Sequence, residues 1–483
     1  LDAFFAANRI PEALFVLVAG GALGSAFIPV FSRFLQSDDA HAWQLASAVM
    51  TASAGAAGVL AAIAYITAPL FIPQYAPDPA LQPLTLDLMR IMLVTPVIFA
   101  VSGLVMGILN AHQIFWLPSL AISMNNVGMI VGALVFARLF PNADGSANIY
   151  GLAWGAVLGA LLHLGVQLPG LWQIRARLRP LTKFRLAGVG EVLRLMGPRV
   201  LGLGVVQINF IVSVSLASSM ADGSISALTV AWQLMFFALG IIAQSVGTAL
   251  FPTLSALAAA ADVDGFKDRL ASAMRSVLFL ALPATVALIL LGRPLVALVA
   301  ERGAWLPEAT LGTAWALGWF ALGIVGHSLL EVLSRAFYAL ADTWTPVLVG
   351  LASMIANIAL SLVFIHTIGD PNTLSHGAFA GLALANSLTT LIEGVILWAL
   401  MSRRLRGIHD ARVFDLLWRT GVATALMGIA LWFLRGWLVP LPSWIALGVG
   451  GLVAGIIFFG VALALRLPEA QSVPQLVLRR LRR

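Results

Sequence analysis

Long apolar stretches alternate with short polar loops along the whole chain. Three of these stretches, 91–109, 201–220 and 445–465, each supply the roughly 20 mostly apolar residues that a helix needs to cross about 30 Å of hydrocarbon. The strands of a membrane barrel would instead be segments of about ten residues with alternating polarity, and the sequence does not have that pattern. We therefore predict an all-α, polytopic membrane protein.

Hydropathy and the positions of the loops between apolar stretches predict about thirteen membrane-spanning helices. The chain begins Leu-Asp-Ala-Phe-Phe, without an initiator methionine or the basic segment of a signal peptide. We therefore expect a further helix ahead of Asp2, which brings the complete protein to about fourteen spans. The expected spans are 2–34, 43–70, 84–110, 117–139, 149–174, 193–219, 225–258, 268–292, 308–338, 344–366, 377–401, 413–435 and 442–465.

Composition agrees with this class of protein. Hydrophobic residues make up 60% of the chain and charged residues only 10%, with a mean hydropathy of +0.96, whereas soluble domains carry about 25% charged residues. The chain contains no cysteine, which excludes disulfides and thiolate metal sites.

The formal net charge of +7 is concentrated in a few places. Basic residues gather in alternate loops and in the C-terminal tail, a pattern that indicates membrane topology and not nucleic-acid binding. The positive-inside rule places these loops and the C-terminus in the cytoplasm. The residues are Arg175, Arg177, Arg179, Lys183, Arg185, Arg194, Lys267, Arg269, Arg403, Arg404, Arg406, Arg412, Arg479, Arg480, Arg482 and Arg483.

The most informative feature is an internal repeat. Short motifs recur at an offset of about 223 to 228 residues across five helices, and shared apolar composition does not explain a constant spacing of Pro, Trp and Gly. An even number of helices per repeat gives both halves the same orientation, which is typical of transporters. The matching positions are Gly24 with Gly247, Pro29 with Pro252, Leu45 with Leu270, Pro69 with Pro294, Trp116 with Trp344, Pro118 with Pro346, Gly151 with Gly377, Gly155 with Gly381, Trp172 with Trp398 and Arg177 with Arg403.

The repeat divides the chain into three expected parts. Residues 1–180 form an N-lobe that lacks its first helix, residues 181–406 form a C-lobe, and residues 407–483 form a C-terminal helix pair with a basic cytoplasmic tail. The predicted architecture is therefore two six-helix bundles in parallel repeat plus two C-terminal helices.

Motifs along nearly the whole chain resemble those of the MurJ (MviN) lipid II flippases, in the same order. They match the family's second, seventh and eighth helices and the segment between its tenth and eleventh. The motifs are Asp2-Ala-Phe-Phe-Ala-Ala-Asn-Arg-Ile-Pro11 with Gly21-Ala-Leu-Gly-Ser-Ala-Phe-Ile-Pro29, Met196-Gly-Pro-Arg-Val-Leu-Gly202 with Gln207 and Asn209, Gly247-Thr-Ala-Leu-Phe-Pro252, and Arg335-Ala-Phe-Tyr-Ala-Leu-Ala-Asp-Thr-Trp-Thr-Pro346.

The resemblance implies a multidrug/oligosaccharidyl-lipid/polysaccharide exporter fold with two lobes around a central cavity. It also implies that lipid II, a polyprenyl-pyrophosphate-linked peptidoglycan precursor, crosses the bacterial inner membrane by alternating access. The lipid-linked oligosaccharide and membrane lipids are then the partners. The sequence departs from the family where cavity charges usually occur: Phe15 and Val16 replace an Arg-Arg pair, and Trp232 and Phe236 replace acidic residues.

Six polar residues are candidates for substrate binding: Asp2, Arg9, Arg199, Gln207, Asn209 and Gln233. A charge inside a span is costly and usually functional, so the two arginines are candidates for contact with a substrate phosphate. The amides can bond to sugar or peptide. The structural alternatives are interfacial arginines, a carboxylate at a helix N-terminus for Asp2, and bonds between helices for the amides of Gln207 and Asn209.

Two acidic positions inside spans invite different interpretations. Glu393 is a lone carboxylate and the candidate for ion coupling, with packing against a polar partner as the alternative. Glu331 and Arg335 are four residues apart and are expected to form an ion pair within one helix.

The sequence contains no motif for catalysis, nucleotide binding or metal binding. We therefore predict a transporter that is not an enzyme and that uses no cofactor, metal, nucleotide or nucleic acid. Three functions compete at this point. They are lipid II flipping, transport of another lipid-linked glycan or cation-coupled antiport of a small molecule in the same fold, and a degenerate membrane scaffold without transport.

Overall fold

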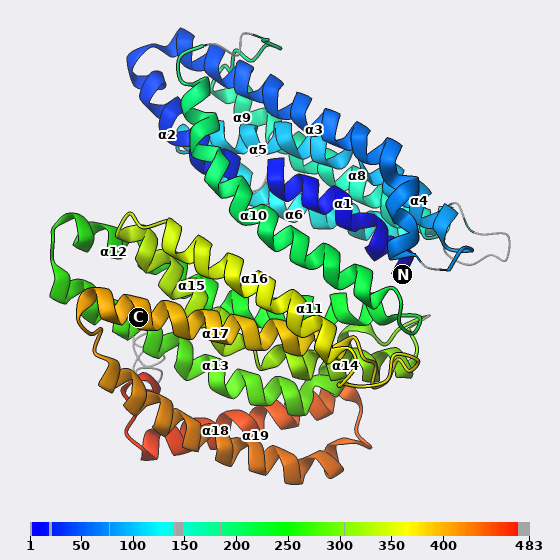
Figure 1. The fold of residues 1–483 in the computed structure, drawn as a ribbon, viewed down its shortest axis with the longest axis vertical. Coiled ribbons are helices and arrows are strands. Elements are labelled where there is room, and N and C mark those ends of the chain that lie inside the picture. The colour runs from blue at the N-terminus through cyan, green and yellow to red at the C-terminus, as the bar shows by residue number, and fades with distance from the viewer. Residues whose placement is uncertain are drawn as a thin grey trace. The chain divides into compact units, whose positions relative to one another are not determined.

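The computed structural model of the chain describes residues 2–18, 22–76, 78–139, 141, 148–182, 186–303 and 305–471 (Figure 1). These ranges contain helices and no strand, apart from an isolated bridge between Asp370 and Gly377. Hydrocarbon offers no hydrogen-bond partners, so a spanning segment satisfies its backbone groups internally by forming a helix. The predicted all-α class is confirmed.

Packing divides the chain into two units, Leu1–Ser219 and Met220–Arg483, which we call unit 1 and unit 2. Each unit is a bundle of helices, some interrupted by π-helical turns, labelled η. Unit 1 contains α1 (Asp2–Val18), α2 (Ala22–Ser37), α3 (Asp39–Tyr75), α4 (Gln82–Met92), α5 (Thr95–Ala111), α6 (Trp116–Val131), η1 (Gly132–Phe136), α7 (Ala137–Leu139), α8 (Tyr150–Gly165), α9 (Leu168–Gln173) and α10 (Val189–Ala217). Unit 2 contains α11 (Ser224–Leu239), η2 (Gly240–Gln244), α12 (Ser245–Ala259), α13 (Val263–Ala300), α14 (Pro307–Ala321), α15 (Ile324–Ala339), α16 (Trp344–Phe364), α17 (Ala380–Leu405), α18 (Asp410–Leu438) and α19 (Ser443–Ala464).

The described residues form ten helical spans that are long and apolar enough to cross a membrane. An eleventh is obtained when α14 and α15, which are bent by 47° at their junction, are counted as one span. The two other predicted spans, 2–34 and 193–219, fall on α1 with α2 and on α10, where some residues or side chains lie outside the described part. With ten or eleven such spans among its described residues, the chain is a multi-pass membrane protein.

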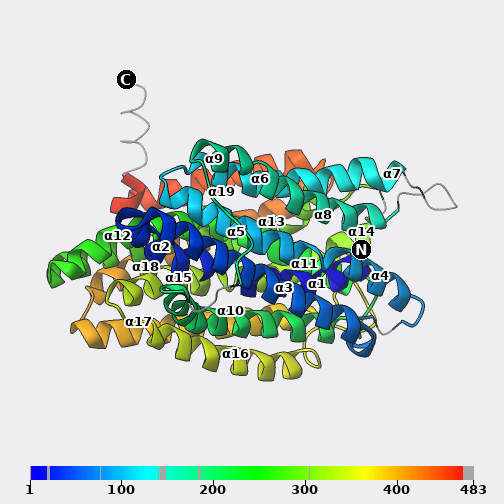
Figure 2. The same cartoon turned by 90° about the horizontal axis from the view of Figure 1, so that it is seen from above.

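The internal repeat recurs in the helix pairs of each unit. In unit 1, α6 packs on α8, α5 on α8 and α1 on α4; in unit 2, the corresponding pairs are α16 on α17, α15 on α17 and α11 on α14. Trp116 begins α6 and Trp344 begins α16, as their shared place in the repeat requires. Figures 1 and 2 both show α6 beside α8. The helices α18 and α19 pack on each other and on α13, outside the repeat.

The division by packing and the expected lobe boundary fall at different places. The repeat sets the boundary near residue 180, whereas α10 packs on α1, α2 and α3 and belongs to unit 1, which ends at Ser219. The two divisions rest on different criteria, and the three-part division into lobes stays a prediction.

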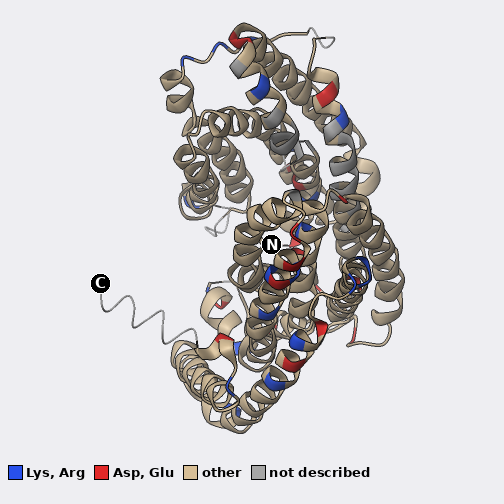
Figure 3. Cartoon of the chain, turned by 90° about the vertical axis from the view of Figure 1, so that its left-hand side faces the viewer, with Lys and Arg blue, Asp and Glu red and all other residues tan. Residues whose placement is uncertain are grey.

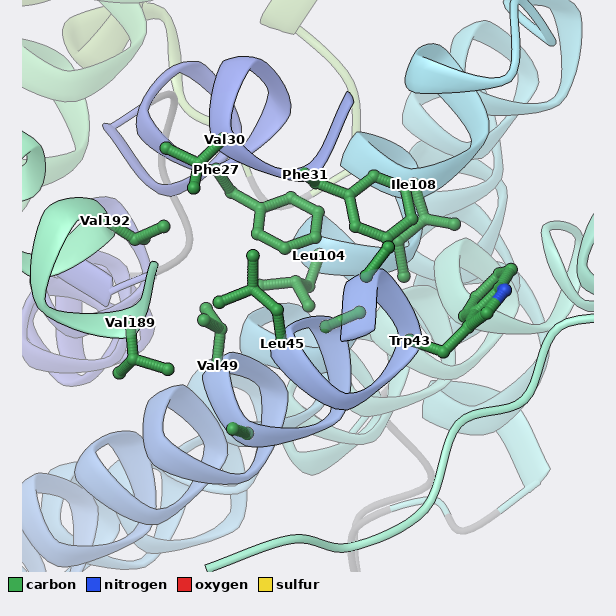
Figure 4. Packing of buried hydrophobic residues seen from close by; sticks show 13 residues of the cluster. Phe27, Val30, Phe31, Trp43, Leu45, Val49, Leu104, Ile108, Val189 and Val192 are labelled. Atoms are coloured by element: carbon green, nitrogen blue, oxygen red, sulfur yellow. The ribbon is translucent and has the colours of Figure 1, made fainter. Parts of the chain in front are cut away.

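A cluster of buried apolar side chains joins α2, α3, α5 and α10 (Figure 4). Phe27 and Phe31 of α2 are fully buried and stack with their ring centroids 5.0 Å apart. The ring of Phe31 also meets Trp43 of α3 edge-on at 5.8 Å. Lipid tails are as apolar as these side chains, so close van der Waals packing holds such contacts together inside a membrane.

Glycines allow α6 and α8 to approach each other closely. A Cβ atom on Gly155 would lie 2.7 Å from Cα of Gly132, and one on Gly128 would lie 2.2 Å from the backbone nitrogen of Gly159. Real Cβ atoms do not come this near to backbone atoms, so these positions admit glycine alone without a shift of a helix. Small residues at helix contacts are the usual basis of packing in membranes.

Replacing Gly155 by alanine should therefore destabilise unit 1. The new methyl group meets backbone atoms that cannot move aside. We therefore expect the free energy of unfolding to fall by about 1–3 kcal/mol, the usual cost of overpacking. Thermal unfolding of the detergent-solubilised protein measures it. Gly165→Ala is the matched control on the same helix, because nothing lies within 4 Å of the position that its methyl group would take. Equal melting temperatures for both variants would contradict the close contact.

Candidate functional site

The first group of candidates lies in unit 1, where α1 packs against α10. The Arg9 side chain is 13% exposed, and its Nη1 donates a hydrogen bond to Oε2 of Glu12 at 3.2 Å. Its guanidinium also lies over the ring of Phe210, 5.5 Å from the centroid. Arg9 is thus a largely buried cation held between a carboxylate and an aromatic ring.

Two amide candidates lie on α10, the helix that contributes Phe210. Gln207 and Asn209 are both half-buried, and Asn209 immediately precedes Phe210. In the described part of the chain, Oδ1 of Asn209 is buried without a hydrogen-bond partner, while its backbone oxygen accepts from Ser213 Oγ at 2.9 Å. Arg199 also falls within α10, but its side chain lies outside the described residues.

The other two substrate candidates lie at the start of α1 and in unit 2. Asp2 begins α1 and is half-buried, about two helical turns before Arg9. Gln233 lies on α11 in unit 2 and is exposed. Within the ranges that the structure describes, no three His, Cys, Asp or Glu side chains are arranged to hold a metal ion.

The aromatic residues at the positions of family charges pack inside their own units. Phe15 on α1 lies against Phe99 on α5, with 4.6 Å between the ring centroids. In unit 2, the ring of Trp232 lies 4.9 Å from Phe236 and meets His327 of α15 edge-on at 5.7 Å. These rings fill the space between neighbouring helices of one unit.

Glu393 lies on α17 and is half-buried against α16. Ser353 of α16 lies within hydrogen-bond reach of its carboxylate and donates to the backbone oxygen of Thr389 at 3.3 Å, and a Cβ atom on Gly350 would lie 3.3 Å from Oε1 of Glu393. Along the same contact between the two helices, the side-chain amide of Asn357 donates to Thr389 Oγ1 at 3.3 Å. The carboxylate therefore sits in a seam of small polar side chains. Figure 3 shows that long stretches of helix carry no Lys, Arg, Asp or Glu, so a charged side chain within such a stretch is isolated.

A buried polar cluster that no sequence motif predicted lies between α5 and the junction of α8 with α9. Oγ of Ser102 lies 2.6 Å from Nδ1 of His163, and Nε2 of Gln167 donates to the same oxygen at 2.8 Å. Ser102 and Gln167 are fully buried and His163 is 8% exposed. A signal was present in the repeat, because the offset that pairs Gly151 with Gly377 also pairs Gln167 with Glu393.

The predicted ion pair between Glu331 and Arg335 is confirmed. The Nη1 atom of Arg335 also donates to Oγ1 of Thr248 at 3.1 Å, and a Cβ atom on Gly247 would lie 2.9 Å from its Nε. The hydrogen bond from Arg335 to Thr248 thereby ties α15 to α12. The local spacing predicted the pair, but the partner on the other helix is distant in sequence and left no local signal.

A carboxylate outside the spans joins the ends of three helices in unit 2. Asp342, between α15 and α16, accepts hydrogen bonds from the backbone and hydroxyl of Thr345 at 3.0 and 2.8 Å and from Arg404 at the end of α17. Partial burial acts to raise the pKa of Asp342, but the bonds from Thr345 and Arg404 outweigh it and hold this pKa below its ordinary value.

The chain matches known proteins over most of its length. The family model described as "Lipid II flippase MurJ" matches residues 1–442. The lipid II flippase MurJ of Burkholderia cenocepacia is 31% identical over 445 residues, which cover 89% of this chain and 83% of that protein. The probable lipid II flippase MurJ of Vibrio cholerae is 29% identical over 487 residues, which cover 95% of this chain and 87% of that protein.

Solved structures show the same fold. The lipid II flippase MurJ in an inward closed conformation superimposes with a TM-score of 0.76 at 23% identity, over 96% of this chain and 93% of that one. An inward-facing MATE family transporter of the MOP superfamily gives a TM-score of 0.68 at 15% identity, over 85% of this chain and 94% of that one.

The repeated helix pairs and the likeness to these structures define a multi-pass membrane protein with the fold that these two transport proteins share. Within that class, the match over residues 1–442 is specific: the chain belongs to the lipid II flippase MurJ family. The family resemblance of the sequence motifs is thereby confirmed.

The Asp342 carboxylate gives unit 2 a stability that depends on pH. Because its pKa is lower in the folded protein than the roughly 3.9 of an unfolded aspartate, its contribution is complete above that value and disappears as the pH falls through the folded pKa. Asp342→Asn keeps an acceptor for Thr345 but loses the charge that faces Arg404, so it should cost about 0.2–1 kcal/mol at pH 7, the usual range for a partly exposed ion pair, and less at pH 3.

Thermal unfolding of the wild-type protein and the variant at both pH values measures this difference. Asp264→Asn is the control, because Asp264 is an exposed aspartate in the first turn of α13 in the same unit. A destabilisation by Asp342→Asn of equal size at pH 7 and pH 3 would argue against a role for the carboxylate charge.

Proposed function

We propose that this protein is a lipid II flippase, which moves the lipid-linked peptidoglycan precursor from the inner to the outer leaflet by alternating access. The observation that carries the proposal is membership of the MurJ family over residues 1–442, a range that includes both copies of the repeat. Lipid II is a large amphiphile, so its transporter needs a polar route for the headgroup while the polyprenyl chain stays in lipid. The protein acts as a transporter and not as an enzyme.

The expected setting is the bacterial cytoplasmic membrane, with membrane lipids and the lipid-linked substrate as partners. The basic loops and the C-terminus face the cytoplasm in this proposal, as the positive-inside rule indicates. The arginines of the loop at 175–185 and of the tail at 479–483 support this orientation.

Arg9 is the residue best suited to meet the substrate pyrophosphate. A guanidinium presents planar, paired donors that match phosphate oxygens, and the low exposure of Arg9 strengthens such a contact. Its present partner Glu12 is 46% exposed, so a pyrophosphate can replace this carboxylate on the same donors. The buried Oδ1 of Asn209 then offers an acceptor for a hydroxyl or amide of the headgroup. Asp2, Arg199, Gln207 and Gln233 are the further contacts of this proposal.

The competing functions receive less support. A cation-coupled antiporter of small molecules shares the fold, but the MATE transporter likeness is at 15% identity and extends to the fold alone. A flippase for another lipid-linked glycan would have to use the same helices without the family relationship that favours lipid II. A scaffold without transport offers no reason for a largely buried arginine inside α1, because such a charge is expensive in lipid.

Complementation tests the proposal. The full-length gene should restore growth to cells depleted of their own lipid II flippase, and Arg9→Ala should reduce this rescue by tenfold or more, since a lost charge-assisted contact costs about 1.5–3 kcal/mol. Arg9→Lys should retain part of the activity. Arg138→Ala, at an exposed arginine of unit 1, is the control. Absence of rescue by the wild-type gene at normal membrane levels would refute the function, whereas full rescue by Arg9→Ala would refute the site.

Glu393 is the proposed ion-coupling residue, and its test is separate. Glu393→Gln keeps the size of the side chain and an acceptor for Ser353 but cannot exchange a charge. We expect lipid II movement in proteoliposomes to continue without a gradient and to lose its response to an imposed proton or sodium gradient. An unchanged response would remove Glu393 from the coupling mechanism. Ser361→Ala, at a buried hydroxyl of the same seam, controls for a general effect on packing.

A further inference from the structure

The cluster of Ser102, His163 and Gln167 takes no part in the proposed substrate contacts. His163 lies near the middle of the apolar span Tyr150–Gln173, far from both of its ends. An ionisable side chain at that depth is expensive in hydrocarbon and therefore marks a functional site by default. The cluster is also almost completely buried, so a surface role is excluded.

The hydrogen bonds of the cluster run in one direction. Nε2 of Gln167 donates to Oγ of Ser102 and to the backbone oxygen of His163, both at 2.8 Å, so that both of its N–H groups are used. The Ser102 oxygen accepts one of these bonds, and its own proton points to Nδ1 of His163 at 2.6 Å. Nδ1 is then an acceptor, which is the neutral imidazole with its proton on Nε2.

The cluster also contains an acceptor for the Ser102 hydroxyl proton when the direction of these hydrogen bonds is reversed. Oε1 of Gln167 is buried and has no hydrogen-bond partner among the described residues. When Nδ1 of His163 carries a proton, it donates to Ser102, and the Ser102 hydroxyl must donate elsewhere. A turn of the Gln167 amide presents Oε1 to that hydroxyl, so the chain can run from His163 through Ser102 to Gln167.

We propose that the Ser102–His163–Gln167 cluster is a proton-binding site of unit 1 and that the bound proton acts on the junction between α8 and α9. In this step one proton adds to Nδ1 of His163, no covalent bond breaks, and the hydrogen bonds of Ser102 and Gln167 reverse. The proton comes from water that reaches the site when the surrounding helices separate.

The link to the backbone runs through Gln167. Its backbone N–H bonds to the oxygen of Leu164 at 3.1 Å, and its side-chain N–H satisfies the oxygen of His163. The side chain therefore caps α8, which ends at Gly165 before α9 begins at Leu168. Turning the amide removes this cap, because the same atom position then holds an oxygen. Proton uptake thus loosens the end of α8.

Within the described part of unit 1, no neighbouring charge compensates a cationic His163 in the present packing. The helices α5, α6 and η1, which pack on α8, contain no ionisable side chain. The charged groups of α4 and α7, which are Asp87, Arg90 and Arg138, belong to the end of the bundle near Tyr150, about 20 Å away along α8. The ring of Phe99 on α5 meets the His163 imidazole edge-on, with 5.3 Å between the ring centroids. The charged form therefore needs a different arrangement of α5 and α8, which couples proton binding to conformation.

The repeat supplies independent support. The offset between the halves pairs Gln167 with Glu393 and His163 with Thr389. Both pairs lie on the equivalent helices α8–α9 and α17, and in both units a titratable group sits among buried hydroxyl and amide groups at this level. The consequence for lipid II transport rests on the proposed function, whereas proton binding itself does not.

Two measurements on the full chain test the proposal. Protection factors of the α8 and α9 amides in lipid nanodiscs, which are hydrogen-exchange rates corrected for the intrinsic rate at each pH, should fall at least threefold from pH 8 to pH 5.5 in the wild-type protein and should not change in His163→Asn. Asparagine retains an acceptor for Ser102 but takes up no proton in this range. His112→Asn, at a histidine that also bonds through Nδ1 in unit 1, should behave as the wild type. The same fall in His163→Asn as in the wild type would overturn the proposal.

Gln167→Glu provides a second variant. It replaces the capping N–H by an oxygen at every pH, so its readout is the titration of the His163 imidazole itself, followed by NMR. A carboxylate beside His163 favours the charged imidazole, so the midpoint of this titration should move upward by about one unit or more relative to the wild type. An unmoved midpoint would overturn the proposal even if His163→Asn failed to fold. Lipid II transport by the wild-type protein in proteoliposomes, measured over the same pH range, tests the proposed function separately. If the wild-type protein does not transport at any pH, the proposed function fails, and the exchange experiment still decides on the proton site.

Discussion

The constraint on which the structure depends is that lipid offers no hydrogen-bond partner to a polar group. Backbone groups meet it by forming helices, and polar side chains meet it by bonding to nearby oxygens. Thr285 illustrates this, because its hydroxyl lies within hydrogen-bond distance of the backbone oxygens of Ala281 and Ala321 on two different helices. Arg335 bonds to Glu331 and Thr248 for the same reason. An oxygen that stays without a partner in such surroundings, as Oε1 of Gln167 does among the described residues, is therefore informative.

The same solvent removes the usual driving force for packing apolar helices together. Close contact must then supply the attraction, which explains why glycines meet glycines where α6 crosses α8. The pairing of helices recurs in both units although few residues are shared between them. Shape at the contacts, and not identity of sequence, thus preserves the duplicated architecture. Side chains at equivalent positions differ, as Arg9 and Trp232 do at one and the same position of the repeat.

Most of the fold was predictable because spans, topology and repeat all leave local or periodic signals. The Glu331–Arg335 pair was predictable for a similar reason, since four residues separate partners on one helix face. What escaped prediction depends on distant contacts: Ser102 reaches His163 across two helices, and α10 packs on α1 although the repeat assigns it to the following lobe. The candidate site shares this difficulty. Hydropathy identified its polar residues one at a time but not which of them meet.

The two repeats place different titratable groups about one helical turn apart on equivalent helices, and this difference bears on an anionic cargo. With His163 and Glu393 in the proposed roles, proton uptake turns a neutral imidazole into a cation in unit 1 and an anionic carboxylate into a neutral acid in unit 2. Both changes add one positive charge to the membrane-embedded part of the protein. A pyrophosphate carries negative charge into the same low-dielectric region, where each uncompensated charge is costly. Proton uptake and headgroup entry therefore lower each other's free-energy cost, and linkage requires that each promote the other. The direction of coupling follows from the signs of the charges alone, before any detail of the moving helices is known.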